Sequence, residues 1–309
     1  MDRTGRRKLP YVLLLLLGFA VATAGCGGNT TANGDTGTGL AVVATTTILG
    51  DLARNVVGDH GTVEVLLPIG ADPHDYQPSA QQVAAMQRAD LVVANGLGLE
   101  EGLADVLASV GEDGANILEI APRLDPIPFD SEGESDDPHV WFDPLRMSGA
   151  AELVADELAA IDGSVDWAAA ATAYGSELAT ADEAIRTILS SVAEPNRRLV
   201  TNHDALGYFA QRYGFEIVGT VIPGGATLAD PSSAELAAVV EAIKRLGVSA
   251  IFAETTEPSV LADAVAAEVG GNIEVVLLYT GSLGEPDSGA DTLIGMLLTN
   301  ARRIAAALS

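Results

Sequence analysis

The chain has 309 residues, of which 48% are hydrophobic, and a formal net charge of −27. This length supplies enough apolar sequence for two domains of ordinary size. So acidic a surface argues against a nucleic-acid partner and against electrostatic binding to anionic lipid. Because Cys26 is the single cysteine, an internal disulfide is excluded and the fold must be stabilised by a hydrophobic core.

Residues 1–25 have the pattern of a secretory signal peptide. Basic residues at positions 3–8 precede an apolar run, 11–22, that is too short to span a bilayer comfortably. Small residues then lead directly to Cys26, which predicts cleavage before this cysteine and lipid attachment to its thiol. An ordinary signal peptide followed by an incidental cysteine is the alternative. Residues 26–39 are rich in Gly, Thr and Asn, and we predict a flexible tether.

From Leu40 onward, short apolar runs rich in β-formers alternate with Ala-rich helical stretches. This alternation is typical of parallel sheets that are covered by helices on both faces. We therefore predict a first α/β lobe over residues 40–163. Its predicted strands are 40–45, 63–68 and 91–95, and its predicted helices run to Val57, over 79–89 and onward from Pro144.

A helical stretch without proline follows, from about Val165 to Val192. Its roughly 28 residues would reach about 42 Å at ~1.5 Å per residue. We predict a stiff linking helix within 164–194 and a second α/β lobe over 195–309. In this lobe we expect a capping box formed by Ser232 and Glu235. Its predicted strands are 198–203, 216–222, 249–254 and 274–280, and its predicted helices lie near 204–213, 232–246, 258–269 and 289–307.

Three of the four histidines, His74, His139 and His203, stand in segments typical of turns: GADPHDYQPS, DDPHVWFDP and TNHDALGYFA. Imidazole is the commonest side-chain ligand for divalent metals such as zinc, although a lone loop histidine is more often a surface or core residue. His74 lies shortly after the predicted strand 63–68, and His203 ends the predicted strand 198–203. Open parallel sheets bind their ligands at such carboxyl ends of strands. A site shared by the three would lie between the lobes. His60 is predicted to lie at the surface.

The histidine segments, together with IFAETTEP, SLGEP and DTLIGMLLTNARRIAAAL, resemble the metal-binding solute-receptor lipoproteins of ABC importers for zinc and manganese. The resemblance runs from about Leu40 to Leu308. It implies an α/β fold of two lobes, with parallel sheets flanked by helices, joined by one long rigid helix. It also implies that His74, His139 and His203 hold one metal ion between the lobes.

The resemblance further implies the place and partners of such a receptor. We expect a lipid-anchored monomer at the extracytoplasmic face of the cell membrane, with an ABC permease and its ATPase as partners. Relatives have also been described as adhesins, which leaves surface interaction as a third interpretation. We expect no enzymatic activity. The alternative from another class is a secreted zinc-dependent hydrolase, in which zinc-bound water is the nucleophile.

The sequence departs from the family at the fourth ligand. Many relatives supply an aspartate in a TDSL-like segment, but this chain has Gly281, which cannot coordinate, between Thr280 and Ser282. We expect a water to complete the shell, followed in order of preference by Glu254 and Asp287. For Glu254, a hydrogen bond that orients a ligand imidazole is an equal alternative.

Three imidazoles with one oxygen donor suit Zn²⁺ in tetrahedral coordination, whereas Mn²⁺ is favoured by more oxygen ligands. Zinc is therefore the expected cargo and manganese the alternative. Trp141 and Phe142, beside the second histidine, are expected to pack the wall of the cleft. Each aspartate that follows or neighbours the histidines is expected to orient an imidazole or cap a helix: Asp75, Asp204 and Asp143, the last as a helix cap.

Overall fold

The computed structural model describes residues 39–129, 135–225, 227, 230–271 and 273–309. The predicted signal peptide, Cys26 and all of the predicted tether except Gly39 lie outside these residues. All described residues belong to one compact unit of the chain, Gly37–Ser309. No helix in this part of the chain combines the length and the apolar character needed to cross a membrane.

A four-stranded parallel sheet with the order β2-β1-β3-β4 forms the centre of the first lobe. Successive side chains of a strand point to opposite faces. Val43 accordingly packs with α2 and α3 on one face, while Val42 packs with α1 on the other. The elements are β1 (Leu40–Ala44), α1 (Thr47–Val57), β2 (Gly61–Val65), α2 (Ala80–Arg88), β3 (Leu91–Ala94), α3 (Ala104–Glu112) and β4 (Ile117–Glu119).

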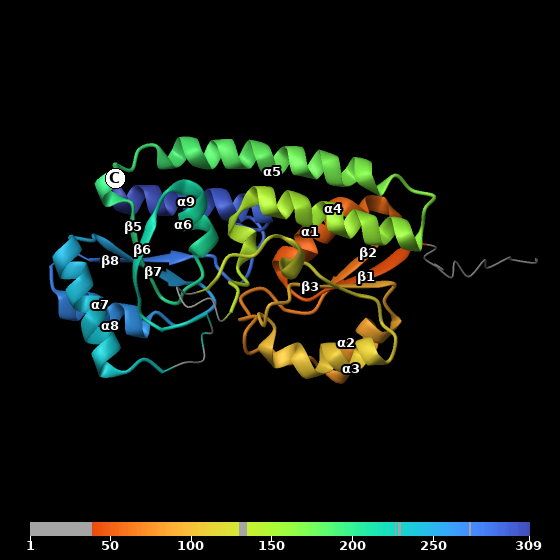
Figure 1. The fold of residues 1–309 in the computed structure, drawn as a ribbon, viewed down its shortest axis with the longest axis horizontal. Coiled ribbons are helices and arrows are strands. Elements are labelled where there is room, and N and C mark those ends of the chain that lie inside the picture. Colours follow the sequence, from red (N-terminus) through yellow and green to blue (C-terminus); the bar gives the residue numbers. More distant parts are fainter. Residues whose placement is uncertain (1–38, 130–134, 226, 228–229, 272) are drawn as a thin grey trace, which may run out of the picture. The chain divides into compact units, whose positions relative to one another are not determined.

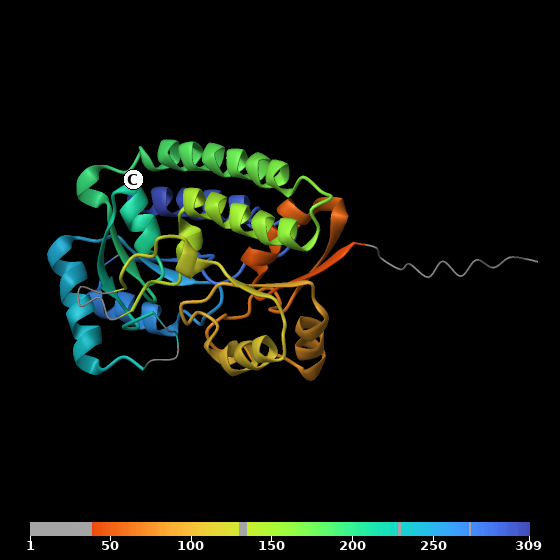
Figure 2. The ribbon, with the colours of Figure 1, turned by 45° about the vertical axis from the view of Figure 1, so that its right-hand side comes forward.

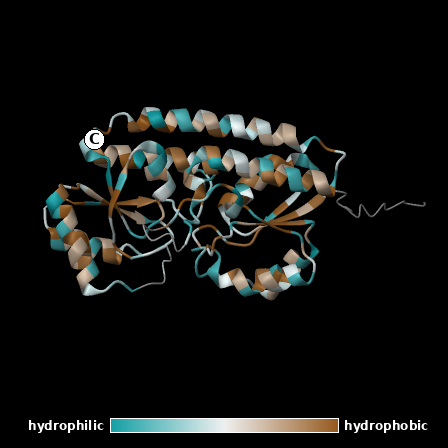
Figure 3. Cartoon of the chain, in the orientation of Figure 1, coloured by the Kyte–Doolittle hydropathy of each residue, from teal (hydrophilic) through white to brown (hydrophobic). Residues whose placement is uncertain are grey.

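The second lobe repeats this topology, since its parallel sheet has the order β6-β5-β7-β8. Helices α7 and α8 cover one face of the sheet, and α6 and α9 lie on the other (Figure 1). Figure 3 shows the apolar strands at the centre of each lobe. The elements are β5 (Arg198–Thr201), α6 (Gly207–Tyr213), β6 (Glu216–Thr220), α7 (Ser233–Leu246), β7 (Ala250–Glu254), α8 (Val260–Val269), β8 (Glu274–Leu278) and α9 (Leu293–Leu308).

Helix α4 (Pro144–Ile161) packs on α1 of the first lobe, and the 23-residue α5 (Trp167–Leu189) connects the two lobes. Helix α5 packs on α4 and α1 and, toward its other end, on α9 of the second lobe (Figures 1 and 2). Its buried side chains recur every three or four residues, which gives one apolar stripe along the helix. A single core cluster contains all of this stripe except Ala181, together with residues of both sheets, so α5 is a rigid strut, and the predicted fold class is confirmed. The stripe consists of Trp167, Ala171, Tyr174, Leu178, Ala181, Ile185 and Leu189.

The helix ends confirm two predicted caps. The Asp143 carboxylate accepts hydrogen bonds from the backbone N–H groups of Leu145 (2.9 Å) and Arg146 (3.4 Å) at the start of α4. Ser232 and Glu235 form the predicted capping box of α7. Helix α6 begins at Gly207, later than the predicted residue 204, because the residues after His203 first form a turn.

Candidate metal centre

His74 lies in the long turn that connects β2 with α2. Its backbone N–H donates to Asp72 Oδ1 at 3.0 Å, and its carbonyl oxygen accepts from the Gly102 N–H at 3.3 Å. The side chain is buried, and its Nδ1 has no hydrogen-bond partner among the described residues. Burial lowers the pKa of His74 to about 3, so the imidazole is neutral at ordinary pH with a lone pair available for a cation.

His139 lies just before α4, in a turn that ends at the Asp143 cap. Asp137 Oδ1 accepts hydrogen bonds from both the backbone N–H of His139 (2.9 Å) and its Nδ1 (2.8 Å). Burial raises the pKa of Asp137 to about 7 and lowers the pKa of His139 well below its usual value. The carboxyl group therefore fixes the ring and leaves Nε2 to point into the centre.

His203 follows β5, at the carboxyl end of the second sheet. Its Nδ1 is hydrogen-bonded to Glu254 Oε1, at the end of the neighbouring strand β7. The other carboxylate oxygen of Glu254 accepts from Thr280 Oγ1 at 2.6 Å. Burial alone would lower the pKa of His203, but the Glu254 charge outweighs it and raises the pKa. Glu254 thus orients His203 in the same way as Asp137 orients His139.

The three imidazoles converge between the lobes. One ring nitrogen from each of His74, His139 and His203 lies within 4.8 Å of the other two. The Nε2 atoms of His139 and His203 are 3.2 Å apart. Two nitrogens that share one tetrahedral zinc at about 2.0–2.1 Å would be about 3.3 Å apart, so this spacing fits a common ion. In the part of the chain that the structure describes, no other set of three or more His, Cys, Asp or Glu converges in this way.

The candidates for a fourth ligand lie in different places. Glu254 contacts the Nδ1 side of His203, away from the Nε2 atom that faces His139. Asp287 is exposed, in a turn with φ 65°, and does not belong to the converging set. Gly281 packs so closely against Pro73 that a Cβ atom at position 281 would be only 2.7 Å from Pro73 Cδ.

Sequence reasoning missed two carboxylates of the centre, Asp72 and Asp137. Each is the first residue of an Asp-Pro-His triplet, and each accepts the backbone N–H of the histidine two residues later. The repeated triplet was the available signal. The sequence pointed instead to Asp75, which is exposed, and to Asp204, whose pKa burial raises to about 6.

Of the two aromatic residues expected at the wall of the cleft, Trp141 packs on His139, whereas Phe142 lies in the core and packs on Trp141. Trp141 and Phe142 are buried, and the Trp141 ring packs at 5.3 Å from the ring of His139. His60 is exposed, as predicted.

A cavity of 340 Å³ adjoins His74, and its lining comes from both lobes and includes the carboxylates of Glu101 and Asp136. Such a lining favours cations near the converging imidazoles.

Known proteins resemble the chain over nearly its full length. The model of the family described as "zinc-uptake complex component A, periplasmic" matches residues 42–307. The manganese-binding lipoprotein MntA of Halalkalibacterium halodurans is 31% identical over 98% of this chain and 99% of its own length. The zinc-binding protein TroA of Treponema pallidum is 29% identical over 87% of this chain and 88% of its own length. A solved structure of TroA aligns with 88% of this chain and 99% of its own, at a TM-score of 0.82 and 27% identity.

Proposed function

Because the chain belongs to the zinc-uptake complex component A family, we propose that it is the extracytoplasmic receptor of an ABC importer, which captures zinc between its lobes and delivers it to the permease. One observation carries this proposal: His74, His139 and His203 bring their ring nitrogens within 4.8 Å of one another. The match of the family model to residues 42–307 confirms the family that the sequence segments resemble.

Capture follows from the origin of the ligands. His74 and His139 come from the first lobe and its connection to α4, and His203 comes from the second. An ion bound to all three therefore ties the lobes together, which stabilises the closed arrangement over any arrangement that separates them. Release to the permease then requires that one ligand be moved away from the others. No bond of a substrate has to be made or broken.

Zinc is the proposed cargo, because neutral nitrogen donors suit zinc better than manganese, which prefers oxygen. We propose a water as the fourth ligand, since Glu254 is hydrogen-bonded to His203 and Thr280 and since Asp287 is exposed. The relatives are named for either metal, manganese for MntA and zinc for TroA. The secreted zinc-dependent hydrolase finds no support among them.

The remaining assignments belong to the same proposal. Signal cleavage after residue 25 would leave Cys26 to carry the lipid anchor, and residues 26–39 would be the tether. The folded part would consist of the lobes 40–163 and 195–309 and of the linking helix within 164–194. The partners would be a permease and its ATPase, with the receptor a monomer at the outer face of the cell membrane. The net charge of −27 speaks against a nucleic-acid partner.

Calorimetric titration of the chelator-stripped protein tests this proposal. We expect one zinc ion per chain, and we expect zinc to displace bound manganese while an equal concentration of manganese leaves bound zinc in place. If manganese displaces bound zinc, the choice of zinc as the cargo is wrong, but the receptor function still stands. If neither metal binds above the level of a protein without the histidine set, the receptor function itself fails.

A further inference from the structure

The dipeptide Thr280–Gly281, just beyond the end of β8, contacts the surroundings of all three histidines. Thr280 is buried, and both its hydroxyl and its carbonyl oxygen are hydrogen-bonded to residues from other segments. Gly281 packs against a third segment through the face where a side chain would stand. Each of these contacts leads to a different histidine.

The first contact leads to His203. Thr280 Oγ1 donates to Glu254 Oε2 at 2.6 Å, while Glu254 Oε1 is bonded to Nδ1 of His203. A buried carboxylate with one oxygen on the ring and the other on a hydroxyl cannot rotate without breaking a hydrogen bond. The hydroxyl of Thr280 therefore holds the carboxylate that holds the imidazole.

The second contact leads to His139. The indole N–H of Trp141 donates to the carbonyl oxygen of Thr280 at 2.9 Å. The Trp141 ring in turn packs edge-on against the ring of His139, with 5.3 Å between centroids. Trp141 is almost fully buried, so a move of the indole would break this hydrogen bond and the packing around the ring. The backbone of Thr280 thus fixes the aromatic wall beside the second imidazole.

The third contact leads to His74. A Cβ atom at Gly281 would be 2.7 Å from Pro73 Cδ, so only glycine lets Pro73 approach the chain here. The next residue, Ser282, accepts the backbone N–H of Gly70 at 2.9 Å, in the same turn of the first lobe. The turn that presents His74 is therefore supported from the second lobe at Pro73 and at Gly70.

We propose that Thr280, together with Gly281, is the positioning element of the metal centre, which sets the three histidines of both lobes at the spacing of one ion. This inference rests on the proposed function. Thr280 is hydrogen-bonded to the side chains of Glu254 and Trp141, and it acts on the histidines through these two residues. Residues that orient metal ligands typically contribute about 10- to 100-fold to metal affinity when they are removed.

The test is Thr280→Val, which keeps the shape of the side chain and removes the hydroxyl. We expect zinc affinity to fall about 10- to 100-fold and the visible spectrum of the cobalt-substituted protein to change. Thr280→Ser, which restores the hydroxyl, should return both toward the wild type. Urea unfolding of the metal-free variants separates this effect from general destabilisation. The change in the free energy of zinc binding should exceed any change in the free energy of unfolding.

Thr201→Val is the matched control. Thr201 is as buried as Thr280, at 3% against 4% exposed, and lies two residues before His203, but its hydroxyl makes no hydrogen bond with a described residue. We expect wild-type zinc affinity for this variant. Equal losses for Thr201→Val and Thr280→Val, an unchanged Thr280→Val, or no rescue by Thr280→Ser would each overturn the positioning role. A wild-type protein that binds no zinc would instead refute the proposed function, before any variant is compared.

Discussion

Replacing His139 by alanine is expected to lower zinc affinity by about 100- to 1000-fold. Structural zinc sites bind with about 10–16 kcal/mol, which is about 2.5–4 kcal/mol for each of four donors, and ~1.4 kcal/mol corresponds to a factor of ten. The loss for His139 should lie in this range because its Nε2 faces that of His203 at 3.2 Å and Asp137 already holds its ring in place. Competition with a chelator of known affinity measures the change.

His203→Ala is expected to give a loss of the same size, because the two rings contribute equivalent donors to the pair. His60→Ala is the matched control, since His60 is exposed and lies outside the converging set. The control should bind zinc as the wild type does. A His139→Ala protein that is folded by circular dichroism and keeps wild-type affinity would contradict the shared site.

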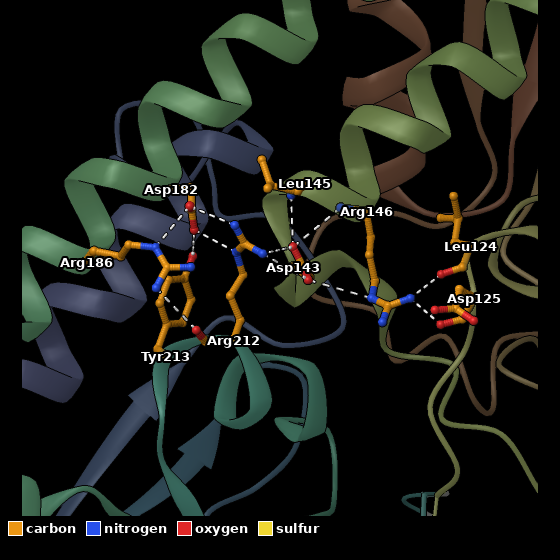
Figure 4. Close-up of polar contacts among 9 residues, drawn as sticks. All are labelled: Leu124, Asp125, Asp143, Leu145, Arg146, Asp182, Arg186, Arg212 and Tyr213. Carbon is orange, nitrogen blue, oxygen red and sulfur yellow. Dashed lines mark hydrogen bonds and ion pairs between the residues drawn. The ribbon is translucent and has the colours of Figure 1, made fainter.

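The second large effect is expected for stability, from Asp182→Asn. Asp182 of α5 is almost fully buried and accepts hydrogen bonds from Arg212 Nε and Nη2, both at 2.7 Å, from Tyr213 at 2.9 Å and from Arg186 at 3.2 Å (Figure 4). Removing the charge leaves the largely buried Arg212 guanidinium without its main partner. Breaking a fully buried ion pair costs about 3–5 kcal/mol, but Arg212 keeps its ion pair with Asp143 at 3.3 Å and its side chain is 13% exposed. We therefore expect a loss at the low end of this range, about 3 kcal/mol, in the free energy of unfolding.

The pH dependence of this loss identifies its cause. Burial alone would raise the pKa of Asp182, but the hydrogen bonds and charge of Arg212, with Tyr213 and Arg186, lower it below the usual value. A depressed carboxyl pKa stabilises the fold above the pKa of the unfolded chain, about 3.9, and this contribution disappears as pH falls through the folded pKa. The difference between wild type and Asp182→Asn should therefore be largest near neutral pH and narrow below pH ~4.

Urea unfolding at several pH values measures both quantities. Glu157→Gln is the control, because Glu157 forms an exposed ion pair with Arg123 at 3.4 Å. Surface pairs of this kind contribute about 0–1 kcal/mol, so this variant should be nearly as stable as the wild type. A difference for Asp182→Asn that stays constant down to pH ~3 would show that packing, not charge, causes the loss.

The ion-pair network also explains how α5 contributes to the centre. Arg212 reaches from Asp182 to Asp143, with 3.3 Å between Nη1 and Oδ1, and Asp143 caps the helix that follows the His139 turn (Figure 4). These ion pairs join α5, the start of α4 and α6 of the second lobe, and α4 and α6 are the helices that follow His139 and His203 in the chain. Asp182 of α5 is thus connected through Arg212 to Asp143, the residue that ends the His139 turn.

Local patterns predicted most of the fold. A short apolar run such as LAVVA is typical of a buried strand. The long stretch without proline that became α5 has apolar residues every three or four positions, which is typical of a helix. Strand β4 was missed because its three residues are too few to show a period. Strand β2 is Gly61–Val65 and not 63–68. Leu66 and Leu67 still donate to the carbonyl oxygens of Ala44 and Thr45, but the pairing cannot continue at Pro68, which has no N–H.

The centre was predictable only in part. The turn contexts of the histidines and the resemblance to a family indicated which imidazoles to consider. The residues that surround the imidazoles are held by hydrogen bonds between distant segments, such as Trp141 with Thr280 and Thr227 with Asp72. No local period encodes such contacts, because they arise only when the two lobes pack. The sequence placed Thr280 at the end of the predicted strand 274–280, but nothing in its pattern indicated the contacts of Thr280 with Glu254 and Trp141.

Zinc-edge anomalous diffraction from crystals of the zinc-loaded protein tests most directly whether the three imidazoles hold one ion. We expect a single strong peak between the lobes, at about 2.0–2.1 Å from one nitrogen each of His74, His139 and His203. A peak elsewhere on the molecule, or a peak that leaves any of these three rings unligated, would contradict the shared metal centre.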